Sequence, residues 1–271
     1  MKIALFGLTG VGNSVLSALV SAGFAPAQIV TREEAKEYPY YPTPHLSELA
    51  EELSIPYSIS DEYHKRTEHC DVLVIATFHR ILARSFLESF RFKFNIHPSL
   101  LPLYRGPNPF YWVLRNQEKQ TGISIHELGE EIDQGPIFWQ QTITIDKNET
   151  QGSLRLRLSN LAGQGIIDVL NQVADDRLEN KLKFKVTSTY FPKPTKTDFT
   201  IDFSRDAASV ASAIRAIIPY PGFLIDGRII TNVRSHSSPM ESVKPGTVVK
   251  KDPNFYLVAT GTNLIMLTFD R

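Results

Sequence analysis

The chain has 271 residues, 42% of them hydrophobic, and its 29 basic and 29 acidic side chains leave no formal net charge. This length accommodates one large and one small domain, and the hydrophobic content excludes an intrinsically disordered chain. The charge balance argues against a protein whose main task is to bind nucleic acid electrostatically.

Two further features limit the class of protein. Cys70 is the only cysteine, so we expect no internal disulfide bond and no cysteine-based zinc site. The amino terminus is typical of a strand that enters a glycine loop rather than of a signal peptide, and no stretch reaches the roughly 18 apolar residues of a membrane span. We therefore expect a cytoplasmic protein with no membrane partner.

The amino-terminal half alternates predicted strands with predicted helices. Residues 71–77 form a continuous apolar run, which is typical of a buried parallel strand, and residues 38–44 hold three tyrosines and three prolines, which predict a loop. The other predicted strands are residues 2–6, 29–30 and 55–59, and the predicted helices are residues 14–22 and 45–53. This alternation predicts an α/β domain with a doubly wound, mostly parallel sheet.

A strand near the middle of the chain carries the most informative side chains. Apolar and polar residues alternate over residues 92–97, and Pro98 ends this strand because proline cannot donate to a sheet ladder. Asn95 and His97 are two positions apart, so they point to the same face at the carboxyl end of the strand, where ligands bind in open α/β sheets. An amide can donate to a developing oxyanion, and an imidazole can accept a proton from an attacking amine. This pair indicates acyl-transfer chemistry.

A carboxylate follows on a turn between two more predicted strands. Residues 121–128 and 136–145 show strand periodicity, and a helix over residues 108–116 precedes them. The sequence Asp-Gln-Gly at residues 133–135 is typical of a turn. Asp133 on this turn could orient His97 or raise its basicity.

The carboxy-terminal part changes character. A helix over residues 154–173 is followed by a proline-rich segment, residues 190–194, which marks a domain boundary and divides the chain into residues 1–190 and 191–271. A helix over residues 207–218 comes next. Short strands separated by turns then predict a small β-barrel: residues 223–225, 228–233, 246–249, 255–259 and 264–269.

These patterns resemble the formyltransferases that use 10-formyltetrahydrofolate. The family signature is Asn-x-His-x-Ser-Leu-Leu-Pro, then a glycine and a distant Asp-x-Gly. It is matched here by Asn95, His97, Ser99, Leu100, Leu101, Pro102, Gly106, Asp133 and Gly135. The resemblance implies that Asn95, His97 and Asp133 are the catalytic residues and that no metal is required. The tail also resembles the carboxy-terminal domain of the methionyl-tRNA formyltransferase group, which implies an oligonucleotide-fold-like barrel; its landmarks are residues 192–194, 202–204, 215, 219–222 and 245–248.

The resemblance further implies a folate pocket at the carboxyl edge of the sheet. The loop after the buried strand is expected to enclose the folate, and main-chain groups are expected to meet the pterin. The residues expected to bind the co-substrate are Phe78, Ile81, Leu82, Leu101, Leu128, Glu130 and Ile132. Ordinary core packing remains the alternative for Leu101, Leu128 and Ile132.

Several residues are candidates for binding the acceptor. The glycines of the first loop do not have the dinucleotide-binding spacing, so the loop is either a tight turn or a phosphate pocket at a helix amino terminus. In the second case Gly10, Gly12 and Asn13 would bind the acceptor. Arg80 and Arg105 are candidates for contacting its anionic groups. Tyr38, Tyr40 and Tyr41 belong either to a nucleotide-stacking surface or to a plain loop.

The acceptor class remains open between a nucleotide-linked amino sugar, the methionine of initiator tRNA and another small amine. The tRNA-specific relatives carry a basic, glycine-rich insertion after the second strand, whereas residues 31–38 are short and net acidic here, and Leu103 replaces a frequent Lys or Arg. The amino sugar is therefore favoured, with tRNA as the only nucleic-acid alternative. A formyltetrahydrofolate hydrolase or folate-binding relative is a further alternative, because water can replace the amine. A homodimer is left open. The histidines expected to be structural or on the surface, because they show no metal-ligand spacing, are His45, His64, His69, His126 and His236.

Overall fold

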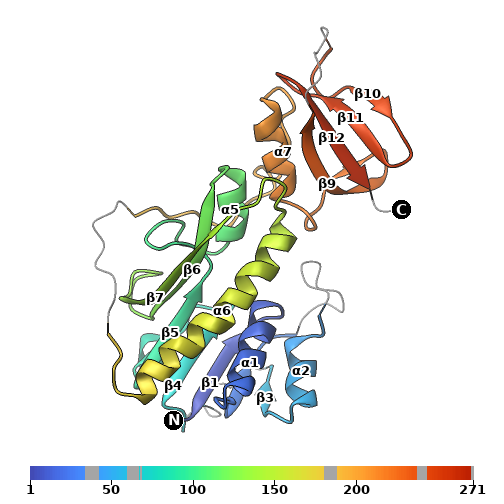
Figure 1. Ribbon diagram of the computed structural model, residues 1–271. Coiled ribbons are helices and arrows are strands. Elements are labelled where there is room, and N and C mark those ends of the chain that lie inside the picture. Colours follow the sequence, from blue (N-terminus) through green and yellow to red (C-terminus); the bar gives the residue numbers. More distant parts are fainter. Residues whose placement is uncertain (34–42, 60–66, 68, 180–187, 237–242, 270–271) are drawn as a thin grey trace. The chain divides into compact units, whose positions relative to one another are not determined.

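The computed structural model describes residues 1–33, 43–59, 67, 69–179, 188–236 and 243–269, and it divides into two compact units (Figure 1). The first unit comprises residues 1–106, 121–143 and 155–190, and the second comprises residues 107–120, 144–154 and 191–271. One division between the units therefore falls at residue 190, where the proline-rich segment begins. Two earlier segments of the chain also belong to the second unit, which the sequence did not predict.

A seven-stranded sheet in the order β3-β2-β1-β4-β5-β6-β7 forms the centre of the first unit. The first five strands run parallel, and β6 is antiparallel to β5. The strands are β1 (Ile3–Gly7), β2 (Gln28–Val30), β3 (Tyr57–Ser58), β4 (Val72–Ala76), β5 (Phe92–His97), β6 (Gln120–Glu127) and β7 (Ile137–Thr144). The chain reverses its direction of winding between β1 and β4, and such a switch point places ligands at the carboxyl ends of the neighbouring strands. The prediction of a doubly wound, mostly parallel sheet is confirmed.

Helices cover this sheet because their apolar stripes match its buried strands. The helices are α1 (Val11–Ser21), α2 (Leu46–Glu52), α4 (Arg84–Leu87) and α6 (Gln151–Ala174). Two glycines of α6 allow close packing: an added Cβ at Gly163 would lie 2.9 Å from Ala18 of α1, and one at Gly165 would lie 2.7 Å from the ring of Trp139. The Trp139 indole donates to Asp168 Oδ2 at 3.0 Å, which fixes this helix on β7.

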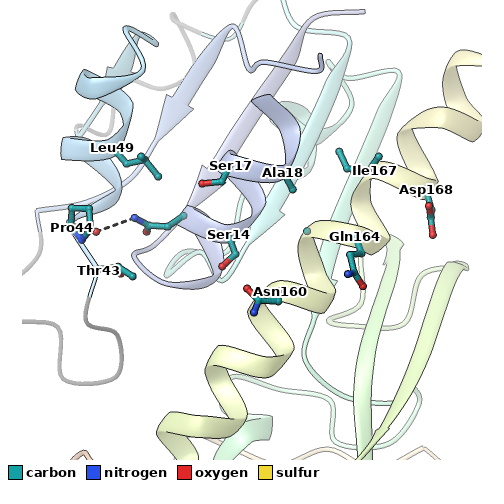
Figure 2. A pocket seen from close by; sticks show the side chains of 12 residues that line it. Ser14, Ser17, Ala18, Thr43, Pro44, Leu49, Asn160, Gln164, Ile167 and Asp168 are labelled. Atoms are coloured by element: carbon teal, nitrogen blue, oxygen red, sulfur yellow. Dashed lines mark hydrogen bonds between the residues drawn. The ribbon is translucent and has the colours of Figure 1, made fainter. Parts of the chain in front are cut away.

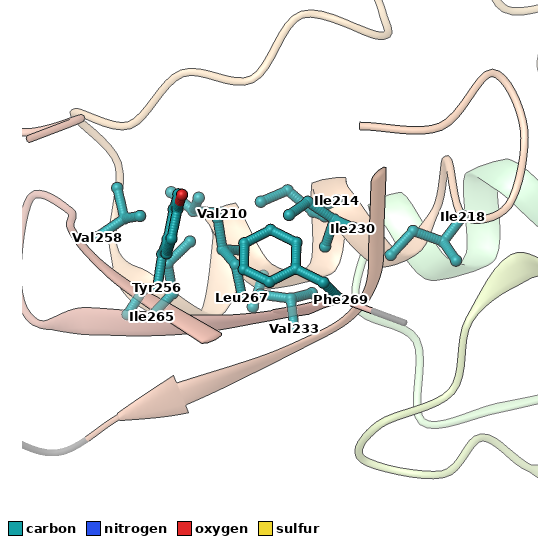
Figure 3. Packing of buried hydrophobic residues seen from close by; sticks show 12 residues of the cluster. Val210, Ile214, Ile218, Ile230, Val233, Tyr256, Val258, Ile265, Leu267 and Phe269 are labelled. Carbon is teal, nitrogen blue, oxygen red and sulfur yellow. The ribbon is translucent and has the colours of Figure 1, made fainter. Parts of the chain in front are cut away.

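The second unit is built around a five-stranded antiparallel sheet in the order β10-β11-β12-β9-β8. Its elements are α5 (Pro109–Arg115), α7 (Ala207–Arg215), β8 (Leu224–Ile225), β9 (Arg228–His236), β10 (Val248–Lys251), β11 (Phe255–Ala259) and β12 (Leu264–Phe269). Figure 3 shows Val210 and Ile214 of α7 packed against strand residues such as Val233 and Leu267. Burial of each such side chain contributes about 1.5–3 kcal/mol. This curled half-barrel confirms the predicted small β-domain.

The observed elements differ from the predicted ones at several boundaries. The first helix begins at Val11 rather than Ser14, because the chain already turns at Gly10, where φ is 99°. The strand predicted over residues 55–59 is reduced to β3, and α4 was not predicted because it is only four residues long. The helix predicted over residues 207–218 ends at Arg215, shortly before Pro219. None of the helices in the described ranges has the length and hydropathy needed to cross a membrane.

Candidate active site

Two strands place polar side chains at the carboxyl end of β5. In the antiparallel pairing of β5 with β6, Asn95 lies opposite His126 and His97 lies opposite Ser124. His97 is buried, with 4% of its surface exposed, and Asn95 is partly buried. The pleat of β5 therefore directs Asn95 and His97 to one face, as the sequence predicted.

The turn between β6 and β7 brings Asp133 to the same place. Its Oδ1 lies 3.3 Å from Asn95 Nδ2 and 3.5 Å from His97 Nδ1, and its Oδ2 accepts a hydrogen bond from the Gly106 N–H at 2.9 Å. Gly135 closes this turn so tightly that a Cβ there would lie 1.9 Å from the carbonyl oxygen of Glu127. The structure thus brings Asp133 into contact with both of the other predicted residues, Asn95 and His97.

The hydrogen bonds around His97 define its tautomer. Its Nε2 lies 2.9 Å from the carbonyl oxygen of Tyr104, and since a carbonyl only accepts, Nε2 carries a hydrogen. In the neutral ring Nδ1 is then the unprotonated nitrogen, and it faces Asp133. Burial lowers the pKa of His97, and the opposing negative charge of Asp133 offsets this only in part. Near neutral pH the ring is therefore a neutral base with its lone pair on Nδ1.

Asp133 is ionised throughout the physiological range. Burial by itself would raise the pKa of this carboxyl, but the neighbouring imidazoles of His126 and His97 and the Gly106 N–H outweigh it and lower the pKa to about 2. A carboxylate that accepts bonds from several donors is stabilised in its charged form.

His126 is a fourth polar residue of this cluster, and the sequence interpretation missed it. It is 1% exposed, and its Nε2 lies 3.1 Å from Asn95 Nδ2 and 3.5 Å from Asp133 Oδ1. Its Nδ1 lies 2.8 Å from the Glu127 carbonyl oxygen, so Nδ1 donates and Nε2 of the neutral ring accepts from the Asn95 amide. The signal that could have identified it is the register of β6 against β5, which a periodicity pattern does not contain.

The predicted folate-binding residues fall into two groups. Leu82 and Leu101 are buried, and Phe78 and Leu128 pack against the hydrophobic cluster that includes Phe6 and Leu82. These four side chains therefore belong to the hydrophobic core or pack against it. Ile81 and Ile132 are different, because 85% and 49% of their surfaces are exposed on the loop after β4 and on the turn that carries Asp133. The Glu130 carboxylate pairs with Arg84, which leaves its main-chain groups as the only candidates for pterin contacts.

The glycine loop after β1 is a tight turn in this structure. An added Cβ at Gly12 would lie 2.9 Å from the side chain of Leu46. Asn13 accepts from the Gly10 N–H and donates to the Pro44 carbonyl, both at 2.9 Å, so its amide stabilises the turn. Figure 2 shows the uncharged polar side chains of α1 and α6, such as Ser14, Ser17, Asn160 and Gln164, that line a groove beside this turn. The volume of the groove is about 760 Å³. Asn95, His97 and Asp133 do not line this groove.

The predicted anion-binding arginines differ in their surroundings. Arg80 is exposed on the loop after β4. The guanidinium group of Arg105 lies 6.0 Å from the centre of the Tyr190 ring and donates to the Ile132 carbonyl at 3.4 Å. Arg105 therefore contacts the turn that carries Asp133. Tyr38, Tyr40 and Tyr41 lie outside the described residues, as does most of the net acidic segment of residues 31–38.

This fold and site define a class of α/β enzyme: an open sheet that gathers an amide, an imidazole and a carboxylate at the end of a central strand, followed by a half-barrel. The chain belongs to the formyl transferase family, because the formyl transferase model matches residues 28–170 and the formyl transferase C-terminal domain model matches residues 193–269. It is a formyl-transferring enzyme, and the family prediction is confirmed.

Comparisons with known proteins extend this assignment. The chain is 34% identical over 233 residues to the methionyl-tRNA formyltransferase of Thermotoga maritima, a match that covers 82% of this chain and 74% of that protein. Its fold matches that of an N-formyltransferase from Helicobacter canadensis in complex with folinic acid and dTDP-3-aminofucose, with a TM-score of 0.77, 17% identity and complete coverage of both chains. WlaRD, a sugar 3N-formyl transferase solved with dTDP and 5-N-formyl-THF, matches with a TM-score of 0.75 and 18% identity over 99% of this chain and 97% of that one.

Proposed function

We propose that this enzyme transfers a formyl group from 10-formyltetrahydrofolate to the amino group of a nucleotide-linked amino sugar, with Asn95, His97 and Asp133 as its catalytic residues. The observation that carries the chemistry is the convergence of Asn95 Nδ2 and His97 Nδ1 on Asp133 Oδ1, at 3.3 and 3.5 Å. An amide donor, a neutral base and a fixed carboxylate are what transfer of an acyl group to an amine requires.

His97 acts as the base in this proposal. Its Nε2 hydrogen is committed to the Tyr104 carbonyl, so Nδ1 takes the proton that the attacking amine gives up. Asp133 stabilises the imidazolium that results, because its carboxylate is ionised and faces Nδ1. When the tetrahedral intermediate collapses, the bond between the formyl carbon and folate N10 breaks, and the imidazolium returns its proton to that nitrogen as tetrahydrofolate leaves. General-base assistance of this kind contributes roughly 10²–10⁴ in rate.

Asn95 stabilises the negative charge that develops on the formyl oxygen. His126 Nε2 accepts one amide hydrogen of Asn95 at 3.1 Å and so orients the side chain, while the second hydrogen makes a longer, 3.3 Å contact with Asp133. Donation to the formyl oxygen replaces that longer contact. Loss of such a donor typically lowers the rate about 10²–10³-fold.

The folate co-substrate supplies the activated formyl group, and the exposed apolar side chains beside the site fit a ligand of this kind. Ile81 and Ile132 expose large apolar surfaces, on the loop after β4 and on the turn that carries Asp133, and a planar, partly apolar ring system would cover them. Leu128 and Phe78 continue this apolar surface into the core. The main-chain groups of Glu130, which are proposed to meet the pterin, lie on the turn that also carries Ile132 and Asp133.

Two observations support an amino-sugar nucleotide as the acceptor. Residues 31–38 contain Arg32 and Lys36 against Glu33, Glu34 and Glu37, a net charge of −1 that cannot attract the phosphates of a tRNA stem. The two structural neighbours described above were solved with dTDP or a dTDP-linked amino sugar, although their identity of 17–18% establishes only the fold. Methionyl-tRNA is the second candidate acceptor, because relatives at 34% identity carry that name.

The test is a folate-absorbance assay with a panel of amino-sugar nucleotides and with charged initiator tRNA, at physiological salt. We expect turnover with at least one amino-sugar nucleotide and little with the tRNA. A control with His97→Asn identifies background transfer. Efficient formylation of methionyl-tRNA with no activity on any sugar nucleotide would assign the acceptor to the second candidate.

A further inference from the structure

We propose that Thr189 is a positioning residue for the candidate active site: it fixes the loop of residues 102–106, which in turn holds His97 and Asp133. This inference rests on the proposed function in one respect, namely that His97 and Asp133 carry the chemistry. Thr189 itself touches neither of them. It lies near the end of the first unit, 92 residues beyond His97 in the sequence (189 − 97).

Thr189 makes three hydrogen bonds to this loop. Its backbone N–H donates to the Pro102 carbonyl at 3.1 Å, its backbone carbonyl accepts from the Arg105 N–H at 3.0 Å, and its hydroxyl Oγ1 accepts from the Tyr104 N–H at 2.9 Å. The adjacent Tyr190 forms a parallel β-bridge with Arg105. The segment around Thr189 therefore acts as a short edge strand for a loop that has no regular structure of its own.

The same loop holds the candidate catalytic groups on its other side. The Tyr104 carbonyl accepts from His97 Nε2 at 2.9 Å, and the Gly106 N–H donates to Asp133 Oδ2 at 2.9 Å. The Arg105 side chain adds a contact of 3.4 Å with the Ile132 carbonyl. Tyr104 is thus fixed at its N–H by Thr189 and fixes His97 through its carbonyl.

The backbone of this loop needs such support. Tyr104 has a φ of 57°, a left-handed conformation that is uncommon for a bulky residue, and Gly106 has a φ of 106°. Residues in such conformations persist where the surroundings determine them. The Thr189 hydroxyl accepts from the Tyr104 N–H, so its removal takes away a hydrogen bond that holds the peptide that orients His97.

The test compares Thr189→Val with Thr189→Ser. Valine keeps the size and the two backbone hydrogen bonds but removes the acceptor for Tyr104, whereas serine keeps the acceptor. We expect Thr189→Val to lower kcat about tenfold or more with a smaller effect on KM, since small displacements of catalytic groups have large kinetic effects. Thr189→Ser should stay close to wild type.

A matched control is Thr262→Val in the second unit. Thr262 Oγ1 accepts from the Ala207 N–H at 3.1 Å, so the same substitution removes the same kind of hydrogen bond away from the loop. We expect this variant to keep the wild-type kcat. Equal losses in Thr189→Val and Thr189→Ser, or wild-type kcat in Thr189→Val, would overturn the proposal.

A second readout does not depend on turnover. Burial lowers the pKa of His97, and the charge of Asp133 and the Tyr104 carbonyl counteract this in part. The titratable groups that face the ring are Asp133 and His126. When the Tyr104 carbonyl is no longer held, the pKa of His97 should fall further, which an NMR titration of the imidazole in Thr189→Val would measure. An unchanged pKa of His97 in Thr189→Val would refute the positioning role, whether or not the wild-type enzyme transfers formyl groups. A lowered pKa of His97 in the variant, together with no formyl transfer by the wild type, would refute only the proposed function.

Discussion

Asn95 and His126 face each other across the β5–β6 ladder, with Asn95 Nδ2 3.1 Å from His126 Nε2. The His126 ring is oriented by its own hydrogen bond to the Glu127 carbonyl, so its acceptor nitrogen points at the amide. This relationship makes the orientation of the Asn95 amide depend on a residue that the family signature does not include.

His126→Leu should therefore reduce turnover without unfolding the enzyme. The substitution removes the Nε2 acceptor that orients the Asn95 amide. We expect kcat to fall by about tenfold to a hundredfold, less than the roughly 10²–10³-fold expected for removing the amide donor itself in Asn95→Ala. Steady-state kinetics on both variants, with circular dichroism as the folding control, would measure the difference; a wild-type kcat in His126→Leu would contradict the assignment.

The pH dependence of turnover follows from the direction of the His97 shift. The base must be neutral to accept a proton, and burial lowers the pKa of His97 despite the opposing charge of Asp133. The acidic limb of the kcat/KM profile, which reports the free enzyme, should then lie below the ordinary histidine value of about 6.5. In Asp133→Asn the opposing charge is gone, so this limb should move to still lower pH while kcat falls. A limb at or above pH 7 in the wild type would argue against His97 as the base.

Asp133 should also make the stability of the fold depend on pH. Its pKa is about 2 in the folded protein and about 3.9 in the unfolded chain, so its contribution is fully present above about pH 4 and is lost as the pH falls towards 2. The size of this contribution is about 3 kcal/mol. Urea denaturation at pH 5 and pH 2.5 should show a larger loss in the wild type than in Asp133→Asn. Equal losses in both proteins would contradict the low pKa.

The turn that carries Asp133 offers a paired test of backbone packing. A Cβ at Gly135 would lie 1.9 Å from the Glu127 carbonyl oxygen, whereas one at Gly129 would meet nothing within 4 Å. Gly135→Ala should therefore displace the turn and abolish turnover, and the loss of stability should lie at or above the upper end of the usual range of about 0.5–3 kcal/mol for single substitutions. Gly129→Ala should be nearly neutral. Thermal denaturation and steady-state kinetics would compare the stability and turnover of Gly135→Ala and Gly129→Ala. Equal losses in the two variants would contradict the close packing of Gly135 against the Glu127 carbonyl.

Ile81 provides a probe of folate binding that leaves the core intact. Because 85% of its surface is exposed, Ile81→Ser should not change the stability of the fold. If a folate ring covers this side chain, its truncation should weaken folate binding by about tenfold, the lower end of what burial of an isoleucine contributes. Calorimetric titration with 5-formyltetrahydrofolate would measure this. Leu82 is a poorer probe because it is buried, so its substitution would also disturb the core. If Ile81→Ser bound 5-formyltetrahydrofolate with wild-type affinity, Ile81 would not belong to the folate site.

Strong local signals made much of this fold predictable. The continuous apolar runs of β1 and β4 and the alternation in β5 identify buried strands, and the polar residues of β5 point to the end of the sheet that binds ligands. The strand period and the turn motif made Asn95, His97 and Asp133 candidate polar groups of one site, and the resemblance to the formyltransferase signature implied that they act together in catalysis. The three meet through contacts no longer than 3.5 Å.

The features that the sequence did not predict depend on contacts between distant segments. The place of His126 depends on the register of β6, and the support of Tyr104 by Thr189 joins residues 85 positions apart. The residues proposed to bind folate separate into buried and exposed groups only when the loops are folded. Such contacts leave no periodicity in the local sequence.

The assignment of residues 107–120 and 144–154 to the second unit bears on how such a protein can change in evolution. The chain passes from one unit to the other after residues 106, 120, 143, 154 and 190. Within the second unit, Tyr111 of α5 is buried and donates to the Asp198 carbonyl at 2.6 Å, and Ser212 of α7 donates to the Leu114 carbonyl. A gene shortened at residue 190 would keep α5 but remove these partners, leaving an apolar helix exposed. The half-barrel is therefore not a module that recombination at a single point can remove, and its loss would require α5 to be redesigned at the same time.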